Sequence, residues 1–478
     1  MMLRPMAIST PSWRALVLTA GLLAFGSTHA HAQTLSEALA ATYETNPNIA
    51  AALDQLRATD EQLAQAYQYW WRPEITSTLE YGKEWIDTST SNTTDSGGNA
   101  VTDFQQETDL KQAEITTTLY LWRGGQTTAA IDNAMATINA QRALFDNTVQ
   151  STLKTAAQAY ANVVLQAVSL NLAHEHETNM LGVEKTVNDL LIARQATTVD
   201  LAQVTLSVIE AQSSRADTLG ELQAARSTFN ASVGSYPTEL QQWPSLPALP
   251  ETLEEAIEIA RRDNPSIIAA KAEVLANEAA VREDEGVLLP TISIVGDYTL
   301  EIESTTYTHS SNIAEHDRIG TGSILLEVSI PFYTGGYNYS IAREAKRTLA
   351  QSRNKLIAAD RTAVDAVTGA WQRLDAAEQR IEIGFAQWAA AADALAGQEK
   401  QFDQGLLTVK DLIEAHGDVV TARQALQQAY YDAFVQSVDL LEAMGHFNAL
   451  TLELDVALHD PTANLNAIMD LPLGIGLD

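Results

Sequence analysis

The chain contains no cysteine among its 478 residues. This absence excludes disulfide bonds, thiolate metal sites, cysteine nucleophiles and lipidation at an N-terminal cysteine. Basic residues are also scarce, because 29 lysines and arginines stand against 61 aspartates and glutamates. A chain with a net charge of -32 repels phosphates, so nucleic acid is not expected as a ligand.

Long apolar runs are missing as well. The first 32 residues carry Arg4 and Arg14, an uncharged stretch over residues 15–25, and small residues before a cleavage point after Ala32. This order is typical of a secretory signal, and the apolar stretch is too short for a membrane anchor, which needs about 20 residues. No later segment reaches the length of a transmembrane helix. If the mature chain enters a membrane, it must do so as a closed β-barrel.

The two halves of the mature chain resemble each other in sequence. Short motifs recur in the same order, with offsets between 210 and 218 residues. Such an ordered repeat indicates an internal duplication. The clearest recurring pairs are Thr34–Leu39 with Thr252–Ile257, Asn46-Pro47 with Asn264-Pro265, Pro73 with Pro290, Gly124-Gly125 with Gly335-Gly336, and Thr198-Val199 with Thr408-Val409.

The duplication predicts the organisation of the chain. A signal peptide over 1–32 precedes a first repeat over 33–235, and a proline-rich linker over 236–250 leads to a second repeat over 251–450. Residues 451–478 form a C-terminal equatorial or tail segment.

Each repeat contains two stretches with strict two-residue alternation of apolar and polar side chains. They predict β-hairpins over 73–122 and 290–333, with polar loops over 87–106 and 303–319. Each strand is long enough to cross a membrane when tilted, and its polar face is acidic and hydroxylic. Alternation alone would favour the edge of a soluble sandwich, but the secretory signal, the aromatic residues at the strand ends and the scarcity of other strands favour a membrane barrel with a wet lumen.

Most of the remaining sequence predicts helix. Residues 126–194 and 337–404 contain no proline, and each stretch would form a rod of about 100 Å. Two shorter helical segments flank each rod and match its length when laid end to end. The segments are 35–70 with 199–233 in the first half, and 253–288 with 408–447 in the second. The lengths predict a paired helical tube.

The points where helix and strand meet are marked by proline and glycine. Pro73 and Pro290 cannot continue a helix and favour extended backbone before them. The pairs Gly124-Gly125 and Gly335-Gly336 permit the turn from strand back into helix.

These motifs together resemble the TolC family of outer-membrane efflux and type I secretion channels, over essentially the whole mature chain. The motifs are the duplicated start over Leu35–Pro47 and Leu253–Pro265, the strand ends Trp122–Gly125 and Tyr333–Gly336, and the stretch Gln404–Leu412.

The resemblance implies a mainly α fold with a small β-barrel part: a long α-helical coiled-coil barrel joined to four transmembrane strands per subunit. It implies a homotrimer in the outer membrane of a Gram-negative bacterium, with a twelve-strand barrel and a periplasmic helical tunnel. It also implies contacts with outer-membrane lipid, a periplasmic adaptor (membrane fusion) protein and an inner-membrane transporter, in either drug efflux or type I secretion.

The resemblance places a periplasmic gate at Asp411 and Glu414, which lie three residues apart and share one helix face. Three copies around an axis would form two acidic rings that favour cations. Asp200 holds the comparable position in the first half, where the turn lacks a glycine equivalent to Gly405. We therefore expect the second half to hold the gate and the first half to complete the wall.

Two other classes of protein fit the sequence less well. An enzyme is not expected, because the histidines lie outside any catalytic or metal-binding motif and no nucleotide-binding loop occurs; no catalytic residue, cofactor or metal is predicted. A soluble periplasmic coiled-coil adaptor would share the signal and the long helices. It should lack the paired alternating strands.

Overall fold

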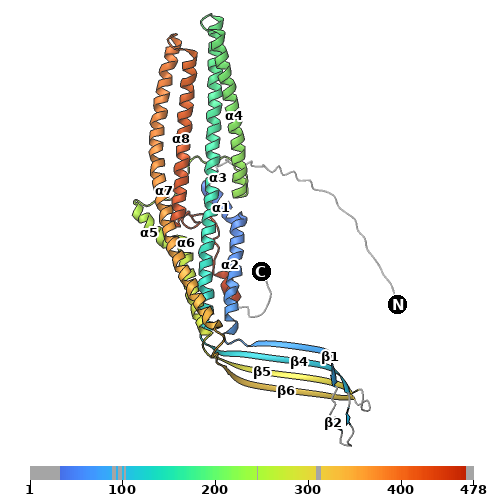
Figure 1. Ribbon diagram of the computed structural model, residues 1–478. Helices are drawn as coiled ribbons and strands as arrows, with labels where there is room; N and C mark the ends of the chain where they lie inside the picture. The colour runs from blue at the N-terminus through green and yellow to red at the C-terminus, as the bar shows by residue number, and fades with distance from the viewer. Residues whose placement is uncertain are drawn as a thin grey trace, which may run out of the picture.

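The computed structural model describes residues 33–88, 93–94, 100–101, 104–244, 246–307 and 314–469. The expected signal peptide and the last part of the C-terminal segment, 470–478, lie outside the described residues. The molecule is elongated, with a stack of long helices at one end and a curved β-sheet at the other (Figure 1). Within the described ranges, no helix is both long and apolar enough to cross a membrane.

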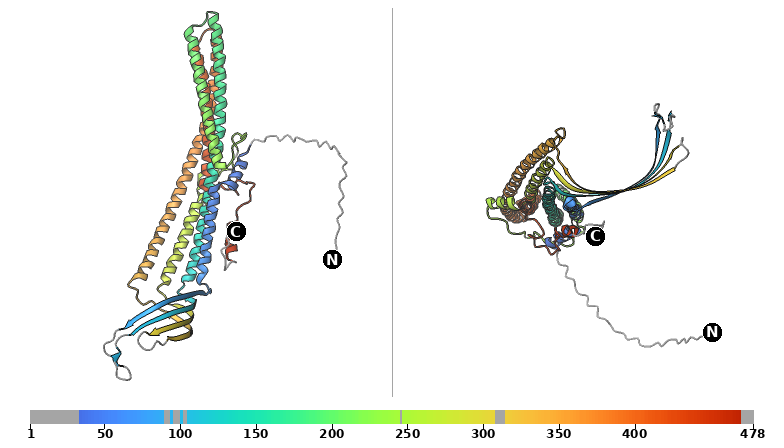
Figure 2. Two further views of the ribbon diagram at one scale, coloured as in Figure 1. Left: turned by 90° about the vertical axis from the view of Figure 1, so that its right-hand side faces the viewer. Right: turned by 90° about the horizontal axis from the view of Figure 1, so that it is seen from below.

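The two predicted rods are the longest elements. Helices α3 (Gln126–Ile192) and α7 (Tyr337–Asp403) each contain 67 residues. Each folds back on a 36-residue partner, α4 (Thr198–Val233) or α8 (Val409–Met444). Two helical hairpins with the same dimensions result, and they lie side by side in Figures 1 and 2.

The helices expected over 35–70 and 253–288 are each broken, which corrects the prediction of two continuous segments. The first becomes α1 (Leu35–Thr45), α2 (Pro47–Ala66) and the short 3-10 helix η1 (Tyr67–Tyr69). The second becomes α5 (Leu253–Asp263) and α6 (Pro265–Gly286). The break falls at an Asn-Pro pair, because proline lacks the amide hydrogen that would continue the helix.

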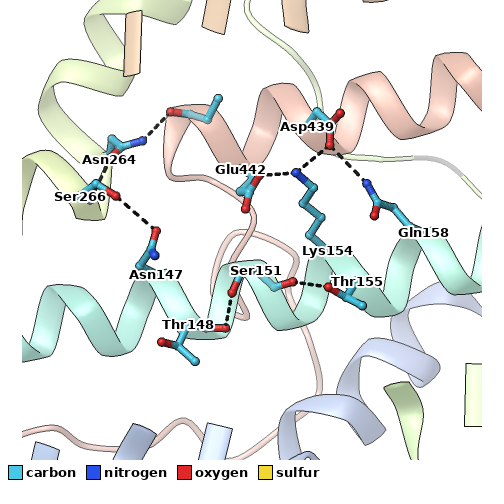
Figure 3. Close-up of polar contacts among 11 residues, drawn as sticks. Asn147, Thr148, Ser151, Lys154, Thr155, Gln158, Asn264, Ser266, Asp439 and Glu442 are labelled. Carbon is cyan, nitrogen blue, oxygen red and sulfur yellow. Dashed lines mark hydrogen bonds and ion pairs between the residues drawn. The ribbon is translucent and has the colours of Figure 1, made fainter. Parts of the chain in front are cut away.

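The asparagine of each pair joins three helix ends, since Asn46 and Asn264 also end α1 and α5 as their C-caps. Asn46 Oδ1 accepts from the Asn48 amide at 2.9 Å and so caps α2, while its Nδ2 donates to the Ser232 carbonyl at the end of α4, also at 2.9 Å. Asn264 repeats both contacts on α6 and on the Ala443 carbonyl at the end of α8, at 2.9 and 2.8 Å (Figure 3). In this way α2 continues the line of α4, and α6 that of α8.

The four long strands form one antiparallel sheet in the order β1-β4-β5-β6. Their bounds are β1 (Glu74–Thr88), β4 (Phe104–Arg123), β5 (Thr291–Tyr307) and β6 (Ala314–Ser329). A small second pair, β2 (Thr93–Thr94) with β3 (Ala100–Val101), lies in the first hairpin. The pairing of β4 with β5 joins the two repeats, from Gln106 opposite Tyr307 to Arg123 opposite Thr291.

The predicted loops 87–106 and 303–319 are too long, because strands β1, β4, β5 and β6 all extend into them. The extensions consist mainly of polar residues such as Thr305, whose hydroxyl lies 3.2 Å from that of Thr108 on the neighbouring strand. Threonine is polar but β-branched, so it suits a strand as well as a loop.

The strand–helix turns use the predicted residues. Pro73 and Pro290 directly precede β1 and β5. All four paired glycines have positive φ, and Gly125 and Gly336 are the N-caps of α3 and α7. At Gly124, with φ of 63°, an added Cβ would lie 2.4 Å from the Gly286 carbonyl oxygen, so this turn requires glycine for space as well as for conformation.

The main core lies at the middle of the molecule, around the two Asn-Pro breaks. Its fully buried side chains include Tyr160, Phe229 and Phe447. The C-terminal segment packs on this region, since His459 stacks on Tyr43 and α9 (Ala463–Met469) lies beside α2. A second core lies at the far tip of the helical hairpins.

Candidate functional site

The turn between α3 and α4 and the turn between α7 and α8 lie together at the tip farthest from the sheet (Figure 1). An apolar cluster joins them, with Met180 and Val187 from α3, Val204 from α4, and Val409 and Leu412 from α8. The tip is therefore one packed unit to which both repeats contribute.

The two turns close in the same way. In the first, the amide of Arg194 donates to Leu191 O at 3.0 Å and that of Gln195 to Leu190 O at 2.8 Å. In the second, Gly405 and Leu406 make the equivalent bonds to Phe402 and Gln401, both at 2.9 Å. Arg194 and Gly405 both adopt left-handed backbone, with φ of 59° and 70°. The first-half turn is therefore as regular as the second although it lacks the glycine, because Arg194 takes the conformation that Gly405 adopts without strain.

The start of each following helix is also the same. Asp411 Oδ2 accepts hydrogen bonds from the Thr408 amide at 3.1 Å and from the Thr408 hydroxyl at 2.6 Å. Asp200 Oδ2 accepts the same pair from Thr197, at 2.8 and 2.7 Å. Both threonines accept in return from the aspartate amide, which completes a capping box.

These bonds hold both carboxylates in the charged form. The pKa of Asp411 lies below its ordinary value mainly because the Thr408 side chain and backbone donate to it. The pKa of Asp200 is lowered chiefly by the backbone hydrogen bond from Thr197. Each bond uses Oδ2 and leaves Oδ1 available, so each aspartate remains an anionic group at the tip.

Glu414 has a different environment. Its carboxylate lies 3.2 Å from Lys410 Nζ, and more than half of each side chain is exposed. An exposed pair of this kind is weak. At the offset that aligns Thr408 with Thr197, the first half has Val199 and Gln203 in place of Lys410 and Glu414. The first two turns of α8 thus carry two carboxylates, and those of α4 carry one.

Two further polar contacts between helices were not predicted from the sequence. Near the tip, buried His416 of α8 has Nε2 3.8 Å from Glu399 of α7, and burial lowers the pKa of His416 and of His176 on α3. At the middle of the molecule, Lys154 of α3 lies 2.9 Å from Asp439 and 2.7 Å from Glu442 of α8 (Figure 3). The partners are far apart in the sequence, which leaves no local signal.

The sheet has one acidic face. The register places Thr78, Glu114, Thr299 and Thr321 in one row across the four strands, and alternate residues continue that face. Away from the helix ends, its described part contains no lysine or arginine; Arg123, after the bulge at the end of β4, lies opposite Thr291 at the edge of this face. The carboxylates on the face are Glu74, Glu80, Glu84, Glu114, Asp297, Glu301, Glu303, Asp317 and Glu327.

The opposite face is apolar and uncovered within the chain. One of its rows is Leu79, Ala113 and Leu300, and another ends in Ile324. Leu79 is 79% exposed and Ile324 is 83% exposed. A large uncovered apolar face marks a surface for lipid or for another protein.

Two long helical hairpins, an acidic tip and a two-faced antiparallel sheet define the protomer of a channel-type transport protein. Comparisons with known proteins agree with this class of protein. Residues 256–446 match the family described as "Outer membrane efflux protein". The outer membrane efflux protein BepC of Brucella suis biovar 1 (strain 1330) is 29% identical over 469 residues, which covers 96% of each chain.

Two further comparisons agree. The outer membrane protein TolC of Escherichia coli (strain K12) is 23% identical over 45% of this chain and 44% of its own. The open-state structure of the MtrE outer membrane channel of Neisseria gonorrhoeae shares the fold, with a TM-score of 0.68 and 18% sequence identity over 87% of this chain and 90% of that one.

The matched family, the relatives and the solved structures all indicate that the chain is a TolC-family outer-membrane efflux channel. They support an outer-membrane location and a role as an exit duct of efflux systems, and the alternative of a soluble adaptor is not favoured. The predicted family, and the predicted mainly helical fold with a small antiparallel sheet, are confirmed.

Proposed function

We propose that three copies of the chain form one continuous duct, in which four strands from each copy close a twelve-strand barrel above a helical tunnel. The sheet carries this proposal. Among the described strands, β1 and β6 each pair on one side only, so the sheet has two open edges. Open edges are not tolerated in lipid, and pairing β6 of one copy with β1 of the next removes them.

The two faces of the sheet support this arrangement. In a closed barrel, the uncovered apolar face would contact lipid and the acidic face would line a water-filled lumen. Apolar side chains are also exposed along the helices, where contacts between copies would cover them. These include Ile209, Leu219, Leu275, Ile357, Ile383 and Phe385.

The tunnel would narrow at the tip. Three copies of Asp411 and Glu414 would form two acidic rings, and Asp200 would add a third set of charges from the first half. Like charges repel when such rings contract, so bound cations would stabilise the closed state. The capping bonds keep Asp411 charged and fix its position at the start of α8.

The duct would work with a periplasmic adaptor protein and an inner-membrane transporter. The sequence has no nucleotide-binding loop, so energy for transport must come from another component. Efflux of small molecules and secretion of proteins both fit this arrangement.

Planar-bilayer conductance tests the gate. The double variant Asp411→Asn/Glu414→Gln removes the charges, while the amide oxygen of the introduced asparagine can still accept the capping bonds from Thr408. We expect higher conductance and a loss of divalent-cation block on the order of tenfold in half-blocking concentration. The matched control is Asp200→Asn, which we expect to have the smaller effect.

Unchanged conductance and block in the double variant would contradict the gate. Migration as a heat-sensitive trimer on a gel, together with sedimentation in the outer-membrane fraction, tests the assembly. A monomer that remains in the soluble fraction would overturn the proposed duct.

A further inference from the structure

In the part of the sheet away from the helices, the lysine and arginine side chains lie on one face. Strands β1, β4, β5 and β6 contain three basic residues away from their helix ends: Lys83, Lys111 and Arg318. The register places Tyr81, Lys111, Ile302 and Arg318 in one row, which belongs to the apolar face. The acidic face has none of these bases in its described part.

The row that holds Lys111 and Arg318 lies at a particular height. Strand β5 runs from Ile292, near the helices, to Ile302 in this row, and apolar side chains dominate the face between them. At about 3.3 Å per residue and a tilt near 40°, ten residues rise about 25 Å, which matches the apolar band of outer-membrane barrels. The row therefore lies at the outer edge of the hydrocarbon layer, at the level of the lipid head groups on the external side.

The face has a hollow beside this row. A shallow cavity of about 310 Å³ is lined chiefly by Leu79, Tyr81, Lys111, Ala113, Leu300 and Ile302. Ala113 forms its floor, because it lies in register between the larger Leu79 and Leu300. The walls are apolar, and Lys111 brings a positive charge to the rim.

The bases differ in how their charge is used. Lys83 Nζ lies 2.6 Å from Glu107 and 3.4 Å from Asp109, so its charge is balanced within the sheet. Lys111 Nζ lies 5.8 Å from the centre of the Tyr81 ring, and neither Lys111 nor Arg318 forms an ion pair with any described residue. Since β4 and β6 are separated by one strand, these two cations are about 10 Å apart.

We propose that this face binds a phosphorylated glycolipid of the outer leaflet, with an acyl chain in the hollow over Ala113 and phosphate groups at Lys111 and Arg318. The hollow suits a flexible hydrocarbon chain and the unpaired cations suit phosphates. The inference rests on the proposed function in one respect, because only a closed barrel would hold this face against lipid.

The test measures binding of defined lipids to the purified, delipidated trimer by native mass spectrometry. The probes are bisphosphorylated lipid A, the same lipid without phosphates, and phosphatidylglycerol. We expect the wild type to prefer bisphosphorylated lipid A over the other two by roughly tenfold or more. Lys111→Gln and Arg318→Gln should each weaken that binding by roughly tenfold, because each removes one charge-assisted contact.

The matched control is Thr118→Glu, which changes the net charge by the same amount as Lys111→Gln but on the opposite face of the same strand and away from the hollow. It should bind lipid A as the wild type does. Ala113→Phe leaves the charge unchanged and fills the hollow, so it should weaken binding of lipid A with and without phosphates.

Equal binding of the phosphorylated and dephosphorylated lipid by the wild type would overturn the proposal, as would equal losses in Lys111→Gln and Thr118→Glu. Preference for phosphatidylglycerol would also overturn it, in favour of a general phosphate surface. Channel conductance is recorded on the same preparations. A conducting trimer without lipid preference contradicts only this inference, whereas a preparation that does not conduct contradicts the proposed duct.

Discussion

The two turns at the helical tip have the same backbone but different chemistry. Both close with the same pair of amide bonds and both begin the next helix with a Thr–Asp capping box. They differ at two places: Arg194 occupies the left-handed position that Gly405 holds in the second half, and Val199 and Gln203 replace Lys410 and Glu414. The two halves thus share the geometry of the turn, and the second half carries an additional carboxylate with a lysine beside it.

The largest effect that bears on this comparison should come from the capping threonines. Thr408→Ala and Thr197→Ala should each destabilise the start of the following helix by about 1 kcal/mol, because the aspartate amide loses its acceptor and the aspartate carboxylate loses the threonine hydroxyl. Hydrogen exchange in the first turns of α8 and α4 measures this loss. Equal losses would establish that the turns are structurally equivalent, and a loss in only one would break the comparison.

The left-handed position should respond with opposite signs in the two halves. Gly405→Ala should destabilise the second turn by about 1 kcal/mol, since a side chain is strained at a φ of 70°. Arg194→Gly should stabilise the first turn by somewhat less, because glycine also gains freedom in the unfolded chain. Exchange of the amides after each turn gives both values. The same sign for both substitutions would contradict the strain at Arg194.

The second hairpin should become less stable as the pH falls. Burial lowers the pKa of His416 below its ordinary value, while nearby Glu399 raises it and His176 lowers it further. The unfolded tip therefore takes up a proton more readily than the folded tip as the pH falls below about 6.5. Neutral His416 thus contributes its full share of the stability of the tip above that pH, and this share is lost as the pH falls from about 6.5 through the lowered pKa of the folded state.

Hydrogen exchange of α8 between pH 7.5 and 5.5 checks this prediction. His416→Thr should flatten the pH dependence, because threonine does not titrate in this range. Threonine is also the residue at the equivalent position of the first hairpin, where Thr205 donates to Glu184 at 2.7 Å. His174→Thr is the control, since the His174 side chain is 70% exposed. An unchanged slope in His416→Thr would assign the pH dependence to other groups.

The smallest effect should come from the Lys410–Glu414 pair. Lys410→Gln should lower the stability of α8 by only about 0.3 kcal/mol, because the pair is exposed and its order along the helix is the weaker one. Its influence on cation block could still be measured, because the charge of Glu414 would be left unbalanced. A stability loss above about 1 kcal/mol would indicate a structural role that the exposed geometry does not explain.

The sequence allows the large elements to be predicted because their signals are local. Two-residue alternation identifies strands β1 and β5, and the long stretches without proline identify α3 and α7. Asp200, Asp411 and Glu414 could be singled out as tip residues from the motifs around them, and the structure places all three at the starts of α4 and α8.

What could not be predicted depends on contacts between distant segments. The repeated Asn-Pro pair is visible in the sequence, but its role becomes clear only when Asn46 meets Ser232 and Asn264 meets Ala443. Arg194 in left-handed backbone is also unexpected, since packing of the tip overrides the preference of a single residue. The burial of His416 depends on its distance from Glu399 of α7, which the sequence does not encode locally.

The pairing of β4 with β5 has a consequence for the order of folding. Gln106 lies opposite Tyr307, so this ladder closes a loop of about two hundred residues, and contacts of such long range form slowly. A chain exported from its N-terminus presents β1 and β4 long before β5 arrives. Until β5 arrives, the edge of β4 in the first hairpin is unpaired and can aggregate. The yield of mature protein should therefore depend on how well this edge is protected during the interval.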